Sequence, residues 1–174
     1  MNALTTLLRS LHGNKVGAAI EELHRSESDL AGALLSLSDQ QKADHEIFHV
    51  ARDLARWSQD HVGRLAEVAK DYGVELDAEP EDEDTLLARL KQKGSELSGR
   101  FHEPGLLLLA DLRHLHKTAA GVSLDWEVLA QTAQAMQDRK LLHVAKECHP
   151  QTERQMKWAE TKVKETAAQI MVTG

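Results

Sequence analysis

Apolar residues recur in this chain at alternating steps of three and four residues over four long stretches. The pattern is clearest over 108–136, where it continues without a slip past Gly121. This spacing places apolar side chains on one face of an α-helix. It predicts a single helix of roughly 33 residues there, about 50 Å long at 1.5 Å per residue.

The same spacing predicts a helical hairpin in the first part of the chain. One helix is expected over 15–37. Ser38, followed three residues later by Gln41, is a capping-box pattern and predicts the start of the second helix. That helix can run to about Tyr72, where Gly73 is expected to stop it.

A second hairpin is expected around Asp138, with a fourth helix over 141–170. Pro150 falls inside this helix, where its missing backbone donor is expected to cause a kink. The chain has only one Tyr and two Phe, so it has little material typical of β-strands.

The stretch 73–104 has a different character. Positions 75–84 hold seven acidic residues and a proline, which predicts an exposed loop. Asp84 or Thr85 could cap a short helix after this loop. Its apolar residues would be Leu86, Leu87, Leu90 and Leu97.

These elements predict an all-α fold. Two antiparallel helical hairpins joined by the long crossover 73–104, with its short helix, make a four-helix bundle. The whole chain, 1–174, is expected to be one domain, in which 1–14 forms an N-terminal segment compatible with a short amphipathic helix.

Composition excludes several classes of partner. With 28 acidic against 21 basic residues, the net charge of -7 argues against nucleic acid or an anionic membrane surface. No stretch reaches the roughly 20 apolar residues of a membrane span. The single cysteine, Cys148, excludes an internal disulfide, and positions 1–11 lack a cleavage site typical of a secretory signal. A cytoplasmic location is therefore expected.

Four polar residues are expected to lie at one level inside the bundle. Glu27 and His49 lie eleven residues before and after Ser38, and Glu127 and His149 lie eleven residues before and after Asp138. In an antiparallel pair, positions equally far from the turn lie side by side, here about 16 Å from the turn.

Further carboxylates accompany these four residues. Glu46 precedes His49 as Glu-x-x-His, and Glu153 lies one turn beyond His149. The position that matches Glu46 in the fourth helix is Lys146, so Glu147 or Glu153 would have to take its place.

Together, the helix order, the long crossover and these residues resemble the ferritin-like superfamily. In its dimetal members, single Glu residues on two helices and Glu-x-x-His on the other two hold two iron or manganese ions. The resemblance implies that two Fe or Mn ions would be bound by a set of six residues: Glu27, Glu46, His49, Glu127, His149 and Glu153.

Simpler interpretations remain open for several of these residues. Glu27 could be a buried carboxylate paired with an arginine of a neighbouring helix, and Glu127 could face solvent. His61 is expected to be a hydrogen-bonded histidine in the core or in an interface. Cys148 is expected to be a small buried side chain.

Two functions therefore remain. The first is a non-catalytic structural or interaction module, in which Lys146 would supply a cation in place of the metal. The second is a dinuclear metal protein that acts in stress or oxygen chemistry, so the sequence leaves open whether the chain is an enzyme. Leu35 and the stretch 106–109 are candidate exposed apolar positions for a homodimer.

Overall fold

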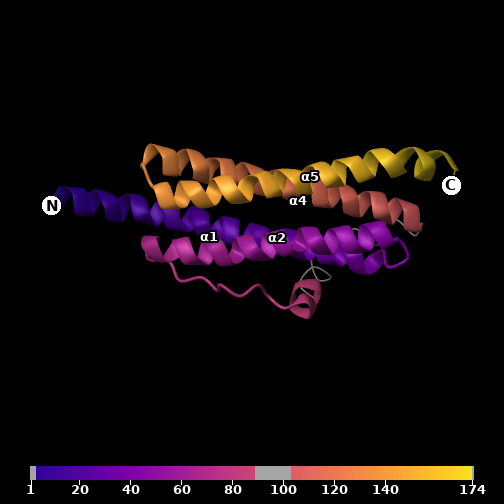
Figure 1. Cartoon of the computed structure of the whole chain (residues 1–174), viewed down its shortest axis with the longest axis horizontal. Helices are drawn as coiled ribbons and strands as arrows, with labels where there is room; N and C mark the ends of the chain where they lie inside the picture. The colour runs from indigo at the N-terminus through magenta and orange to yellow at the C-terminus, as the bar shows by residue number, and fades with distance from the viewer. Residues whose placement is uncertain (1–2, 89–102, 174) are drawn as a thin grey trace.

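A computed structural model describes the backbone of residues 3–88 and 103–173 and the side chains of 15–88 and 103–172. These ranges contain helices and no strand (Figure 1). The four long helices are α1 (Ala3–Gln40), α2 (His45–Ala69), α4 (Pro104–Ala135) and α5 (Arg139–Thr173).

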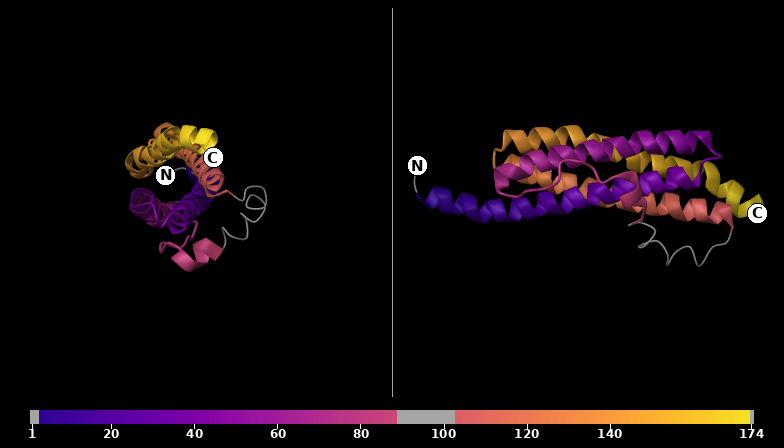
Figure 2. Two further views of the ribbon diagram at one scale, coloured as in Figure 1. Left: turned by 90° about the vertical axis from the view of Figure 1, so that its right-hand side faces the viewer. Right: turned by 90° about the horizontal axis from the view of Figure 1, so that it is seen from below.

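The long helices form two antiparallel hairpins packed against each other. Helix α2 packs on α1 and α5, and α4 packs on α1 and α5, so the four helices surround one core. In Figure 1, α2 ends at the left end of the bundle and α4 begins at the right end. The connection between them therefore spans the length of the bundle, as the predicted crossover does. Figure 2 shows the same arrangement from the end and from below.

The first turn lies later in the chain than the sequence pattern predicts. Ser38 is fully buried inside α1, where its hydroxyl donates a hydrogen bond of 2.8 Å to the carbonyl of Phe48. The N-cap of α2 is Asp44, whose carboxylate accepts from the backbone of Ile47 at 3.0 Å. The capping-box interpretation of Ser38 is wrong because its hydroxyl bonds to the neighbouring helix instead.

The other predicted ends are close to the observed ones. Helix α2 continues as a short 3-10 helix, η1 (Lys70–Tyr72), and Gly73 follows in the left-handed conformation at φ 72°. The second turn lies at Asp138, which caps α5 through the backbone of Leu141 at 3.0 Å. Asp138 also accepts a hydrogen bond from the hydroxyl of Tyr72, so the two hairpins are joined at this end.

The third and fourth predicted helices are continuous. Helix α4 runs unbroken past Gly121, and α5 runs past Pro150. Pro150 is exposed, so the backbone position without a donor lies on the solvent side of α5. At the N-terminus, residues 3–14 do not form a separate helix, because they continue directly into α1.

Charged and polar contacts hold the described part of the crossover against the first hairpin. The backbone carbonyl of Asp77 lies 2.8 Å from the imidazole of His24. Further along, Glu83 forms a bidentate pair with Arg52 at 2.7 and 3.1 Å. Within the described residues, the expected short helix covers 83–88, and its cap is Asp82 rather than Asp84 or Thr85.

Within that short helix, Leu86 is buried and joins the main core. Leu90 and Leu97, predicted to lie on the same helix, fall outside the described residues. Leu35 is only 4% exposed, so it belongs to the core and not to a surface for a homodimer. In the described ranges, no helix is long and apolar enough to cross a membrane.

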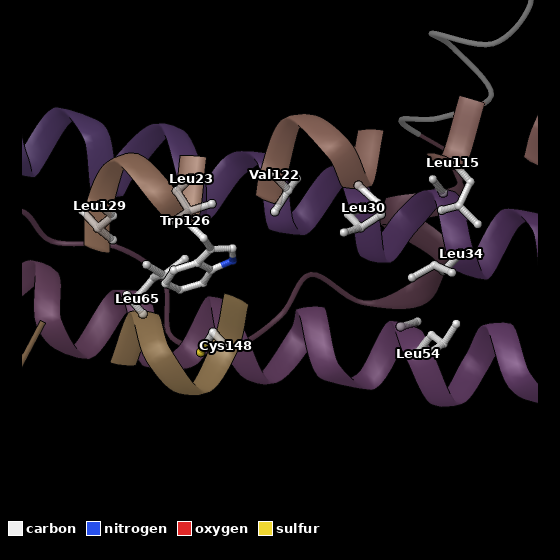
Figure 3. Close-up of a cluster of buried hydrophobic side chains, with 14 of the residues drawn as sticks. Leu23, Leu30, Leu34, Leu54, Leu65, Leu115, Val122, Trp126, Leu129 and Cys148 are labelled. Carbon is white, nitrogen blue, oxygen red and sulfur yellow. The ribbon is translucent and has the colours of Figure 1, made fainter. Parts of the chain in front are cut away.

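The core is a continuous row of apolar side chains along the bundle axis. Figure 3 shows this row and the indole of Trp126 pointing into it from α4. All four long helices contribute, and the largest side chains are less than 2% exposed. Burial of such side chains contributes roughly 1.5–3 kcal/mol each to stability. The labelled members are Leu23, Leu30, Leu34, Leu54, Leu65, Leu115, Val122, Trp126, Leu129 and Cys148.

Replacing Leu115 by alanine is expected to destabilise the protein by about 2–5 kcal/mol, because the side chain is 1% exposed and its removal leaves a cavity. The matched control on the same helix is Leu124→Ala. Leu124 is 68% exposed, so this change is expected to stay within about 0.5 kcal/mol. Urea unfolding of both variants measures the difference, and equal effects would contradict this packing of α4.

Candidate functional site: a buried carboxylate and imidazole

One carboxylate lies in the centre of the apolar core. Glu27 of α1 is fully buried, and its Oε1 atom is the meeting point of three polar contacts. It accepts hydrogen bonds from Trp126 Nε1 at 2.6 Å and from Thr152 Oγ1 at 3.2 Å. The third contact is His61 Nδ1 at 2.8 Å.

The geometry of His61 indicates that the imidazole is positively charged. The side chain is 1% exposed, and its Nε2 atom lies 2.8 Å from Oε1 of Gln151. An amide oxygen accepts hydrogen bonds and cannot donate them, so with this orientation of the Gln151 amide Nε2 is placed as a donor. Nδ1 faces the carboxylate of Glu27 and is the donor there as well. Both ring nitrogens therefore face acceptors, an arrangement that favours an imidazolium.

Electrostatics favour the same protonation state. Burial alone would lower the pKa of His61, because a charged ring loses its hydration in the core. The polar contacts with Cys148 and Glu27 and the negative charge of Glu27 outweigh burial and raise the pKa to about 10. The ring also packs edge-on against Trp126, with centroids 5.7 Å apart.

This cluster joins all four long helices through polar side chains. Glu27 comes from α1, His61 from α2, Trp126 from α4, and Thr152 and Gln151 from α5. A buried ion pair stabilises a fold only when its remaining polar atoms are also satisfied. Here the donors converge on one oxygen of the carboxylate. The other oxygen, Oε2, is buried and has no hydrogen-bond partner among the described residues.

Three of the six predicted metal ligands lie close together, outside this cluster. Nε2 of His149 lies 2.8 Å from Ser123 Oγ and 4.0 Å from a carboxylate oxygen of Glu153. Its Nδ1 atom lies 3.7 Å from Glu127. The two carboxylates therefore face different nitrogens of one ring, and both are more than half exposed. A metal ion bound to one nitrogen of His149 would therefore lie beside only one of the two carboxylates.

The remaining two predicted ligands lie on the surface. Glu46 is exposed and pairs with Lys162 of α5 at 2.5 Å. His49 is exposed and does not lie opposite Glu27 as the sequence pattern predicts. The residue beside Glu27 is His61, twelve residues further along α2, or about 18 Å at the helical rise.

The position of the first turn explains this correction. Glu27 lies seventeen residues before Asp44, and His61 lies seventeen residues after it. Counting from Asp44 instead of Ser38 therefore pairs the two residues that are in contact. Both lie on apolar stripes of their helices, so the polar pair could have been found from the sequence with the correct turn. The hydrogen bonds of Trp126 and Thr152 to Glu27 could not have been predicted from a sequence pattern in the same way.

These residues are poorly matched to a dimetal centre in their observed positions. The buried carboxylate is contacted by an indole N–H, a hydroxyl and an imidazolium, and the first and last of these cannot bind a cation. In the described ranges, no group of three or more His, Cys, Asp or Glu side chains is placed to hold a metal ion. Lys146, expected to supply a cation near the site, is exposed.

Glu27→Gln is expected to destabilise the protein by about 3–5 kcal/mol, because it leaves the buried imidazolium of His61 without its counter-charge. Glu127→Gln is the matched control, since Glu127 is 51% exposed and should change stability by no more than about 0.5 kcal/mol. Chemical denaturation measures both. A loss at Glu27 no larger than at Glu127 would show that the pair contributes little.

Stability from this pair should also depend on pH. His61 has a pKa raised to about 10 in the folded protein, above its ordinary value near 6.5. Its contribution is therefore complete below about pH 6.5 and is lost as the pH rises through about 10. The reference is the double variant Glu27→Gln/His61→Asn, which retains all other titrating groups.

The quantity to follow is the difference in free energy of unfolding between wild type and this double variant, from pH 6 to pH 11. It should decrease with rising pH across that range. A difference that stays constant, or one that increases with pH, would contradict a charged His61.

Comparisons with protein-family models, with curated proteins and with solved structures find no match for this chain.

Proposed function

We propose that this protein is a ferritin-like helical bundle that acts as a non-catalytic structural or interaction module. In this proposal, the Glu27–His61 pair holds the place that two metal ions occupy in the dimetal members of that superfamily. The helix order supports the assignment, because two antiparallel hairpins are joined by a connection as long as the bundle.

The observation that carries the proposal is the set of donors around Glu27. A carboxylate in a bundle core needs a cation beside it, and in the dimetal members of the superfamily metal ions supply that charge. Here the cation is the imidazolium of His61, and Trp126 and Thr152 add neutral donors to the same oxygen. The protein therefore supplies internally the positive charge that a metal would otherwise bring.

Glu46, one of the exposed carboxylates of the predicted set, is paired with a cationic side chain of the protein as well. Lys162 is only 9% exposed and lies between Glu46 and Glu165, at 2.5 and 2.7 Å. Both carboxylates that the resemblance assigns to the first hairpin, those of Glu27 and Glu46, are thus paired with cationic side chains of the protein. This pairing favours a module stabilised by its own ion pairs.

A dinuclear iron or manganese protein remains the second candidate. It is favoured by the grouping of Glu127 and Glu153 about His149 and by the buried oxygen of Glu27 that lacks a partner. When bound, such metals would supply oxygen or redox chemistry. This candidate requires rearranged side chains, because Glu27 and His149 have different neighbours in the structure.

Elemental analysis of protein purified without a chelator separates the two candidates. The module is expected to contain no iron or manganese, and addition of either ion should leave its melting temperature unchanged.

The homodimer and the cytoplasmic location stay predictions.

Two iron or manganese ions per chain, lost in Glu27→Ala but retained in the surface control His143→Ala, would overturn the proposal in favour of the second candidate. Because Glu27→Ala also removes the partner of His61, circular dichroism should accompany the analysis. A folded variant without metal would identify Glu27 as a ligand.

A further inference from the structure

The first two turns of α2 carry two imidazoles on one face. His45 and His49 are four residues apart, and residues at this spacing are neighbours on a helix surface. Their rings lie with centroids 6.0 Å apart and planes inclined by 28°. The two rings are therefore stacked neighbours on the helix.

Both rings are available to an external ligand. Each side chain is exposed, and neither ring makes a hydrogen bond to another part of the described structure. This differs from His61, whose two nitrogens are both engaged inside the core.

Packing around His49 limits the directions its ring can take. Phe48 packs edge-on against the ring, with centroids 4.9 Å apart. The guanidinium of Arg52 lies over the ring of Phe48 at 5.0 Å and is itself held by the carboxylate of Glu83. A ligand ring held in place by its neighbours loses less conformational freedom when it binds an ion.

The carboxylate between the two histidines has a different partner. Glu46 extends toward α5, where it pairs with Lys162 at 2.5 Å. Consequently, the two imidazoles are the side chains left to bind a metal ion on this part of α2. The carboxylates of Asp44 and Glu46 contribute negative charge nearby. That charge offsets the positive end of the helix dipole, which would otherwise disfavour a cation.

We propose that His45 and His49 bind one divalent transition-metal ion of the zinc or copper class as a two-nitrogen chelate. Imidazole is a preferred ligand of zinc, copper and nickel, and two histidines four residues apart on one helix face are a known arrangement for zinc. The other coordination positions are filled by water or by a group from another molecule.

This site shares His49 with the set of residues predicted for the dinuclear candidate, but it is a different site. The dinuclear candidate combines His49 with His149 and four carboxylates for iron or manganese, whereas this site has two nitrogens and depends on His45, which the dimetal set does not include. The inference does not rest on the proposed structural role, so the two can fail independently.

The test is calorimetric titration of the metal-free full-length protein with Zn²⁺. Wild type is expected to bind one ion at this site, and His45→Ala and His49→Ala are each expected to weaken its binding at least tenfold. Both positions are exposed, so both variants should fold, as circular dichroism would verify. His143→Ala is the matched control, an exposed histidine on α5 that should leave this binding unchanged.

Electron paramagnetic resonance of the Cu²⁺ form adds a second measurement. Two nitrogen ligands are expected in wild type and one in either single variant. The proposal is overturned if wild type does not bind Zn²⁺, if both single variants bind as wild type does, or if the copper spectrum keeps its nitrogen count in them.

Discussion

The interaction on which this structure depends is the buried contact between the Glu27 carboxylate and the His61 imidazole. Taking two charges out of water costs several kcal/mol for each ion, and only close pairing with further hydrogen bonds offsets that cost. The 2.8 Å contact satisfies the first condition. Trp126 and Thr152 satisfy the second for Oε1 of the carboxylate, while Oε2 has no partner among the described residues, and Gln151 satisfies it for the imidazole. Every long helix therefore has to be in place for the pair to be stable.

Such a pair can fix the register of the helices along one another, which apolar packing alone leaves undetermined. Helices with long apolar stripes can slide past each other by one turn and still bury similar area, because hydrophobic contact is not directional. A shift of one turn, about 5.4 Å, would separate His61 from Glu27 and leave both charges unpaired in the core. We infer that the polar cluster fixes the register of α1 against α2 and of both against the second hairpin. The end contact between Tyr72 and Asp138 acts in the same direction.

Much of the fold could be predicted from the spacing of apolar residues, because one face of each helix is buried along most of its length. Helix α4, with Gly121 inside it, and the turn at Asp138 are clear examples. The first turn could not be placed, since Ser38 satisfies a capping pattern but uses its hydroxyl on the neighbouring helix. An error of six residues in the turn changed the predicted neighbour of Glu27 from His61 to His49. The burial of Glu27 could be predicted from its position on an apolar stripe. Its partner, His61, could not, because that contact depends on how two helices pack against each other.

The protonation state of His61 tests this account most directly. Nitrogen NMR of the uniformly labelled protein resolves the two ring nitrogens of each histidine and shows whether both carry protons. At pH 8, where an ordinary histidine is neutral, the account predicts that both nitrogens of His61 remain protonated and that Nδ1 shows a hydrogen-bonded proton. A neutral ring at pH 8, with one nitrogen unprotonated, would contradict the claim that a protein cation balances Glu27 in the core.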